Sequence, residues 1–399
     1  MPIVPHWFLP TNGDSRTDLS LGNAVGVEGT RVHRDGGHRA PDVDYIGQIA
    51  SAAERLGFHA ALTPTSSWCE DAWVMTAALT QLTERFKFLV AFRPGFQSPT
   101  LTAHMAATYQ RISGGRLLLN VVTGGDDAEQ RRFGDFLDKA DRYQRAAEAL
   151  HVVRELWTGE PVDFDGRFVQ VQGAKIIPHP VWPDIYLGGS SEPALDVAAR
   201  YADVFLTWGE PPEAVTAKLD AVRERAEHHG RRLRFGIRLH VIARETSEEA
   251  WAEAQRLLAG LDPAEIARQQ EIQRASGSEG QRRMVALHGG RTDHLEVYPN
   301  LWAGIGLVRG GAGTALVGSH EEVADRIAEY HGLGIEEFIL SGYPHLEEAY
   351  RVGECVLPLL GRRGLLAEPA PAATVPPTTA TVATATSTPK SEHTLARTQ

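Results

Sequence analysis

The chain has 399 residues, of which 42% are hydrophobic and 23% charged, and its formal net charge is −11. Nucleic-acid binding needs clustered Lys and Arg, so this acidic balance argues against a nucleic-acid partner. Two cysteines exclude a disulfide framework, and the absence of a signal peptide or an apolar run of about 18 residues predicts a cytoplasmic protein without a membrane segment.

Short apolar runs typical of strands alternate along the chain with longer segments of helical spacing. Strands that alternate with helices pair in parallel through right-handed crossovers. Eight such strands predict a (β/α)₈ barrel, and a doubly wound sheet is less suitable because no strand precedes a Gly-x-Gly-x-x-Gly turn. The expected strands are residues 3–9, 59–63, 86–92, 116–123, 185–188, 204–208, 235–242 and 337–341, with helices at residues 44–56, 101–112, 140–157, 193–201, 212–229 and 321–333.

Three insertions and a tail depart from this alternation. Residues 162–176 alternate polar and apolar side chains around Asp165-Gly166, which predicts a β-hairpin. Residues 20–40 form a loop after the first strand, and residues 261–294 are polar and partly helical, as in a mobile lid or a surface helix with a loose loop. We expect residues 1–366 to form one domain, and the Ala/Thr/Pro-rich residues 367–399 to be a disordered tail.

The C-terminal ends of barrel strands carry the site residues of this fold. Here they hold hydroxyls, arginines, aromatics and glycines, without the paired carboxylates of a glycosidase, metal-ligand spacing or a Gly-x-Ser-x-Gly elbow. Ser190 and Ser191 precede a predicted helix, whose backbone amides suit a phosphate. Arg238 and Arg309 suit a second anion. Such a site predicts that a bound cofactor, and no metal, supplies the chemistry.

Long motifs accompany these strand ends. They are Trp7-Phe8-Leu9-Pro10-Thr11, Cys69-Glu70-Asp71-Ala72-Trp73, Leu206-Thr207-Trp208-Gly209-Glu210-Pro211-Pro212, Gly236-Ile237-Arg238-Leu239-His240, Asn300-Leu301-Trp302-Ala303-Gly304, Arg309-Gly310-Gly311-Ala312-Gly313-Thr314 and Leu340-Ser341-Gly342-Tyr343-Pro344-His345-Leu346-Glu347-Glu348. In sequence and order they resemble the alkanesulfonate monooxygenases of the bacterial luciferase-like superfamily, over almost all of the expected domain.

This resemblance implies a barrel that uses reduced FMN (FMNH₂) and O₂ to convert an alkanesulfonate into an aldehyde and sulfite. It also implies a separate NAD(P)H-dependent FMN reductase as partner, and a homodimer or homotetramer. The implied catalytic residues are Arg238, His240, Arg309, Tyr343 and Cys69, and the substrate-binding residues are Arg238, Arg309, Trp208 and Asn12. The implied flavin-binding residues are Thr123, Arg142, Tyr143, Ser190, Ser191 and Cys69.

Some of these residues have plainer interpretations, and the chain departs from the family in places. His240 is equally consistent with a histidine buried in the core without a catalytic role, and Cys69 is consistent with a small unreactive side chain. The family usually has a histidine at the position of Asn12, and Gly-Arg-Ser where Ser67-Trp68 precede Cys69, so an altered chain-length or head-group preference is expected. The alternatives are a related oxygenase acting on a sulfone or another small organic molecule, a deazaflavin enzyme that transfers hydride, and a flavin-binding protein without catalysis.

Overall fold

The structure is a computed structural model that describes residues 1–16, 19 and 38–366. The predicted tail and most of the predicted loop at residues 20–40 lie outside the described residues. Within them, no helix is long and apolar enough to cross a membrane.

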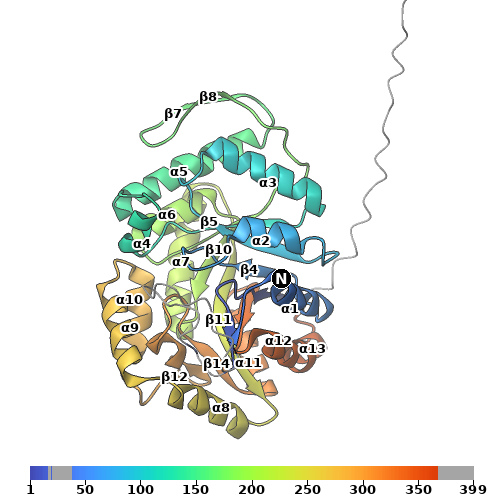
Figure 1. Ribbon diagram of the computed structural model, residues 1–399, viewed down its shortest axis with the longest axis vertical. Coiled ribbons are helices and arrows are strands. Elements are labelled where there is room, and N and C mark those ends of the chain that lie inside the picture. Colours follow the sequence, from blue (N-terminus) through green and yellow to red (C-terminus); the bar gives the residue numbers. More distant parts are fainter. Residues whose placement is uncertain (17–18, 20–37, 367–399) are drawn as a thin grey trace, which may run out of the picture.

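Eight parallel strands form a closed barrel at the centre of the molecule (Figure 1). The pairing of β10 with β11 closes the ring, with Val204 opposite Arg234. All eight strands coincide with the predicted runs, so the barrel prediction is confirmed. In ring order they are β1 (Val4–Phe8), β4 (Ala60–Thr63), β5 (Lys87–Phe92), β6 (Leu117–Val121), β9 (Ile185–Gly188), β10 (Val204–Trp208), β11 (Arg234–Arg244) and β15 (Glu337–Ser341).

Helices surround the barrel, and their ends follow local capping chemistry. The Asp42 side chain accepts a hydrogen bond from Tyr45 N at the first helix, and α3 ends at Gly114 with a positive φ of 69°. The helices that were predicted are observed as α1 (Val43–Arg55), α3 (Pro99–Ser113), α5 (Lys139–Leu156), α6 (Glu192–Tyr201), α7 (Pro212–His228) and α11 (His320–Gly332). Further helical segments that were not predicted are α2 (Ala72–Leu79), α4 (Asp127–Arg132), α8 (Ser247–Ala259), α12 (His345–Arg351), η2 (Val352–Val356) and α13 (Leu357–Arg362).

Apolar side chains fill the interior of the barrel. Leu89, Leu118, Tyr186 and Ile339 belong to a compact buried cluster that is separate from the larger cluster shared with the outer helices. Because successive strand residues point to opposite faces, the compact cluster is the barrel interior. The filled interior leaves the C-terminal end of the barrel as the place for a site.

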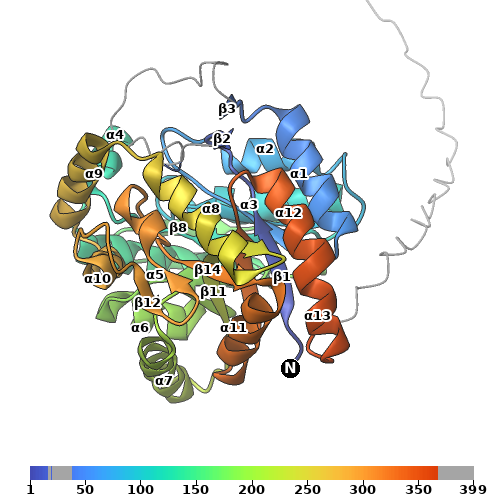
Figure 2. The ribbon, with the colours of Figure 1, turned by 90° about the horizontal axis from the view of Figure 1, so that it is seen from below.

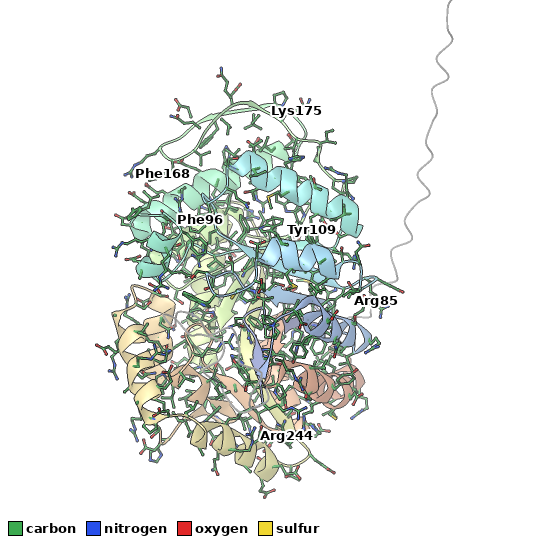
Figure 3. All side chains as sticks on the ribbon, in the orientation of Figure 1. Arg85, Phe96, Tyr109, Phe168, Lys175 and Arg244 are labelled. Atoms are coloured by element: carbon green, nitrogen blue, oxygen red, sulfur yellow. The ribbon has the colours of Figure 1, made fainter. Side chains whose placement is uncertain are left out.

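Strand β11 is longer than its neighbours and carries a small sheet beyond the barrel. Its second half pairs with β14 (Ala315–Ser319), which continues into β13 (Leu301–Trp302) and β12 (Glu296–Tyr298). Arg244, labelled in Figure 3, ends this long strand. The predicted hairpin is confirmed as β7 (Val162–Asp165) and β8 (Gln170–Ala174), and the labels of Phe168 and Lys175 mark it at the top of Figure 3.

Residues 261–294 form a pair of packed helices, α9 (Pro263–Ala275) and α10 (Glu279–His288). The pair lies beside α4 on one side of the barrel (Figure 2). The partly helical prediction is therefore confirmed, and the segment is more regular than the sequence indicated. Its polar character has a structural reason, because its glutamines are buried: Gln269, Gln270, Gln273 and Gln281.

Candidate active site

Two arginine side chains are buried together at the C-terminal end of the barrel. Arg238 lies on β11, and Arg309 follows the short helix η1 (Gly304–Leu307); their exposures are 5% and 8%. Their guanidinium carbons lie 4.7 and 5.4 Å from the ring centroid of Phe8, at the end of β1. Among the described residues, both hydrogen-bond to neutral groups, and neither forms an ion pair with a carboxylate. The arrangement, called the arginine pocket below, is therefore a buried cationic cluster suited to an anion.

Burial changes the proton affinity of both groups. It lowers the pKa of Arg309 to about 10, so this guanidinium keeps its charge at neutral pH. Burial and the positive charge of Arg309 also lower the pKa of Arg238. Two cations held close together in a desolvated site attract an anion more strongly than the same charges in water.

Ser341, at the end of β15, connects Arg238 to His240. Arg238 Nη2 donates to Ser341 Oγ at 2.7 Å, and Ser341 Oγ lies 2.8 Å from His240 Nδ1. Burial and the nearby arginines lower the pKa of His240, so its imidazole is neutral. Its Nε2 lies 3.2 Å from the carbonyl oxygen of Ala312, which can only accept, so the ring proton is on Nε2 and Nδ1 accepts from Ser341.

Tyr343, in the loop after β15, joins the same group. Its hydroxyl accepts a hydrogen bond from Arg309 Nη1. Its ring is stacked on His240 with a centroid distance of 5.6 Å and an interplanar angle of 14°. The structure thus brings Arg238, His240, Arg309 and Tyr343 together at the C-terminal end of the barrel.

Cys69 and Asn12 lie in two loops that are joined at the mouth of the barrel. Glu70 N donates to Thr11 O at 2.8 Å, which connects the loop after β4 to the loop after β1. Burial raises the pKa of Cys69 to about 12, although Thr11 and Arg309 act in the opposite direction, so Cys69 is a neutral thiol. Asn12 is half-buried next to Thr11.

Trp208 and the α9–α10 pair cover the mouth. A Cβ at Gly280 of α10 would come within 2.9 Å of the Trp208 indole, so the helix backbone packs closely on this ring. Gln281 Oε1 accepts from Gly311 N at 2.8 Å, two residues after Arg309. Arg283 forms an ion pair with Glu210, which follows β10. The helix pair therefore holds the loops that carry Trp208 and Arg309.

A second polar group lies at the turn from β9 to α6. A Cβ at Gly188 would come within 2.9 Å of Leu206 O, and one at Gly189 within 2.4 Å of Ala194 Cβ, so the backbone here is packed too closely for larger residues. Ser191 is the N-cap of α6, and its buried hydroxyl has no hydrogen-bond partner among the described residues. A helix N-terminus with an unpaired hydroxyl fits a phosphate.

The other predicted phosphate ligands lie on neighbouring elements. The Tyr143 hydroxyl is 3.5 Å from the Cβ position of Gly189, which places it at the same turn. Arg142 Nη2 pairs with Asp127 at 2.7 Å, so this guanidinium already has a carboxylate partner. The Thr123 carbonyl accepts from Gln130 Nε2 at 2.8 Å. The loop after Thr123 is joined to the helix pair, because Ser276 Oγ donates to Gly125 O at 3.3 Å.

A buried pair next to the arginines, Asp14 and His345, was not predicted from the sequence as part of the site. His345 Nδ1 lies 2.9 Å from Asp14 Oδ1, and the imidazole packs edge-on against Tyr343 with a centroid distance of 5.1 Å. Both residues are separated from a barrel strand by only a few positions, and Asp14 is the first carboxylate after the first strand. The position of both residues shortly after a barrel strand was the feature of the sequence that could have identified them as site residues.

Comparisons with known proteins agree with this fold. The model of the family described as luciferase-like monooxygenase matches residues 25–337. A solved riboflavin lyase with modified FMN is similar, with a TM-score of 0.76, 19% identity, and coverage of 92% of this chain and 93% of the lyase. EDTA monooxygenase from Chelativorans sp. BNC1 has a TM-score of 0.72, 20% identity and coverage of 93% and 97%. A long-chain alkane monooxygenase has a TM-score of 0.71, 21% identity and coverage of 92% and 93%.

Proposed function

Because the chain belongs to the luciferase-like monooxygenase family, we propose that it is a flavin-dependent monooxygenase that desulfonates alkanesulfonates. In the overall reaction an alkanesulfonate, FMNH₂ and O₂ give an aldehyde, bisulfite, FMN and water. The observation that carries this proposal is the buried pair Arg238 and Arg309, which has no carboxylate partner among the described residues. A sulfonate keeps its negative charge at every pH of interest and offers three oxygens to these donors.

The turn from β9 to α6 fits the phosphate of FMN. Ser190 and Ser191 would hold it through the helix N-terminus and the unpaired Ser191 hydroxyl, with Tyr143, Arg142 and Thr123 nearby. Bound reduced flavin supplies the electrons and the reaction with O₂. A separate NAD(P)H-dependent FMN reductase would deliver it, and we propose a homodimer or homotetramer in the cytoplasm by analogy with the family.

The chain's own residues bind and orient the substrate. Arg238 and Arg309 hold the sulfonate, while the Tyr343 hydroxyl is held by Arg309 and can donate a hydrogen bond at the same place. His240 is neutral and fixed by Ser341, so it orients Arg238 without adding a charge. The neutral Cys69 thiol can donate a weak hydrogen bond toward the flavin.

The mouth of the site would set the choice of substrate. Trp208, under Gly280 of α10, provides an apolar wall for an alkyl chain and helps to exclude water. Asn12 cannot take up a proton, and the Trp68 ring is covered by the guanidinium of Arg132 at 5.8 Å. Asn12 and Trp68 both border the entrance, so we propose that desulfonation is retained with an altered preference for the chain length or head group of the substrate.

The test is turnover coupled to an FMN reductase. Methane- to decanesulfonate, dimethyl sulfone and octane are each supplied, and sulfite and organic products are measured. We expect sulfite and the matching aldehyde from one or more sulfonates. A product from the sulfone or alkane without sulfite from any sulfonate would indicate the related oxygenase, and tight FMNH₂ binding without any product would indicate a flavin-binding protein without catalysis.

A further inference from the structure

Asp14 and His345 form a buried pair at the edge of the arginine pocket, and both are 1% exposed. The Asp14 carboxylate lies 2.9 Å from His345 Nδ1 through Oδ1, and Oδ2 accepts from His345 N at 2.7 Å. The Tyr45 hydroxyl also donates to Oδ2. Arg39 Nη1 donates to this hydroxyl at 3.0 Å, so the carboxylate is held from a second element, α1.

These contacts determine the tautomer of His345. Burial and the charges of Arg309 and Arg238 lower the pKa of His345, although Asp14 acts in the opposite direction, so the imidazole is neutral. Burial raises the pKa of Asp14, but the hydrogen bonds donated by His345 and Tyr45 outweigh burial and lower it, so Asp14 is a carboxylate. A carboxylate only accepts hydrogen bonds, and the ring proton must therefore be on Nδ1.

His345 Nε2 is then a free acceptor inside the protein. It is buried and has no hydrogen-bond partner among the described residues. A buried polar atom without a partner destabilises the fold, so such an atom calls for an explanation. The imidazole contacts Phe8, at a centroid distance of 5.7 Å, and Tyr343; these are the rings that also contact Arg309. The imidazole that carries the free acceptor thus shares its neighbouring rings, Phe8 and Tyr343, with Arg309.

From this geometry, and resting on the proposed function, we propose that His345 is the proton acceptor of the desulfonation site and that Asp14 is the residue that positions it. Oxygenation of the carbon next to sulfur gives a 1-hydroxyalkanesulfonate. His345 Nε2 takes the hydroxyl proton, the O–H electron pair forms the carbonyl double bond, and the C–S pair leaves with sulfite. The proton then passes to sulfite, which leaves as bisulfite, and no oxidant is consumed in this step.

Asp14 has two effects in this step. It keeps the proton on Nδ1, so that Nε2 can accept, and its negative charge stabilises the imidazolium that forms. Asp14 Oδ1 also accepts from Ser15 N at 2.9 Å. In Asp14→Asn, an amide oxygen that keeps the bonds from His345 N and Tyr45 places the NH₂ group opposite Nδ1 and Ser15 N, so Nδ1 no longer faces an acceptor. The ring proton would then move to Nε2, and the acceptor would be lost.

The first test is the tautomer of His345 in protein free of FMN, measured by ¹⁵N NMR of the imidazole. We expect Nδ1–H in the wild type and Nε2–H in Asp14→Asn. Asp44→Asn is the matched control, because Asp44 is an exposed carboxylate on α1, next to Tyr45. In this variant His345 should keep its proton on Nδ1. An Nε2–H tautomer in the wild type would overturn the proposal.

The second test uses 1-hydroxyoctane-1-sulfonate, the bisulfite adduct of octanal, with protein free of FMN. We expect the wild type and Asp44→Asn to accelerate release of octanal, and Asp14→Asn and His345→Gln to lose that acceleration by about 10²-fold. Thermal unfolding checks that both variants are folded. Wild-type protein that releases sulfite from octanesulfonate with FMNH₂ but does not accelerate adduct breakdown overturns the His345 step alone, whereas absence of sulfite in the complete reaction overturns the proposed function.

Discussion

At the scale of single residues, the site contains two cations that have no carboxylate partner within the part of the chain that the structure describes. Arg238 and Arg309 lose their hydration on burial, and this lowers the pKa of both guanidinium groups. Phe8 and the hydroxyls of Ser341 and Tyr343 hold them in place without neutralising them. A bound anion would supply the opposite charge, so the proposed function predicts a preference for anionic substrates.

Removing either arginine should weaken the action on sulfonates far more than flavin binding. We expect Arg238→Ala and Arg309→Ala to lower kcat/KM for octanesulfonate by about 10²-fold or more, because the remaining buried cation cannot hold the sulfonate alone. FMNH₂ affinity, from anaerobic fluorescence titration, should change by less than about threefold. Arg232→Ala, at an exposed position, is the control. Equal kcat/KM in the variants and wild type would exclude the arginine pocket as the sulfonate site.

The pKa of Arg309 predicts how binding changes at high pH. Its value of about 10 means that the positive charge is complete at pH 7 and is lost as the pH rises through 10. The KM for octanesulfonate should therefore begin to rise near pH 9 and about double by pH 10, where half of the Arg309 side chains are neutral. KM values measured from pH 7 to 10 check this. A constant KM up to pH 10 would show that Arg309 keeps an ordinary pKa or does not bind the sulfonate.

At the scale of elements, the strands could be predicted from the sequence, but the helix pair at the mouth could be predicted only in part. Buried parallel strands are short continuous apolar runs, so the barrel strands stand out. Helices α9 and α10 instead bury glutamines such as Gln270, whose Nε2 donates to Leu307 O at 2.8 Å. Polar residues usually indicate an exposed segment, and a sequence pattern does not show that the amide groups of these glutamines form hydrogen bonds inside the protein.

The same distinction applies to the site. Arg238 and His240 lie within the strand run predicted at residues 235–242, and Tyr343 follows the run at 337–341, so their meeting at one end of the barrel could be predicted. Asp14 and His345 lie 331 positions apart, and only the closure of β1 against β15 brings them together. A contact of this kind has no local pattern in the sequence.

The helix pair should control access of water to the site. Arg283→Ala removes the ion pair with Glu210, and Gln281→Ala removes the bond to Gly311 N. We expect each variant to release more hydrogen peroxide and about two- to tenfold less sulfite per FMNH₂ consumed, because the reactive site is less protected. Arg282→Ala is the control, since the ion-pair partner of Arg282 among the residues described is Glu279, on its own helix. An unchanged ratio of peroxide to sulfite in both test variants would contradict a covering role.

At the scale of the whole molecule, the two ends of the barrel have different tasks. The C-terminal end carries the arginines, whereas the N-terminal end holds a buried polar cluster around Glu337 on β15. Glu337 accepts from Tyr186 at 2.5 Å and from Arg234 Nη1 at 2.6 Å, and it lies 3.0 Å from His6 Nε2. These partners come from three other strands of the barrel, β9, β11 and β1, and the N-terminal end of this fold generally serves stability.

Neutralising Glu337 should therefore destabilise the fold without affecting the site. Glu337→Gln should lower the free energy of unfolding by about 3–5 kcal/mol, measured by urea denaturation. Burial raises the pKa of Glu337, but His6 and Arg234 outweigh it and the net pKa is lowered. The charged Glu337 side chain therefore stabilises the fold above the ordinary pKa of a glutamate, and this stabilisation is lost as the pH falls through the pKa of Glu337 in the folded protein. Glu336→Gln, one residue earlier, should have little effect because burial raises the pKa of Glu336; equal stabilities of the two variants would contradict this role.

The central claim is that reduced flavin and the paired arginines together release sulfite from an alkanesulfonate. A single-turnover measurement tests it most directly: protein loaded with FMNH₂ without oxygen is mixed with O₂ and octanesulfonate, and sulfite is counted per active site. We predict close to one sulfite and one octanal per FMNH₂ for the wild type, and almost none for Arg238→Ala. Oxidation of the flavin without sulfite from octanesulfonate or any other sulfonate of the series would contradict the claim.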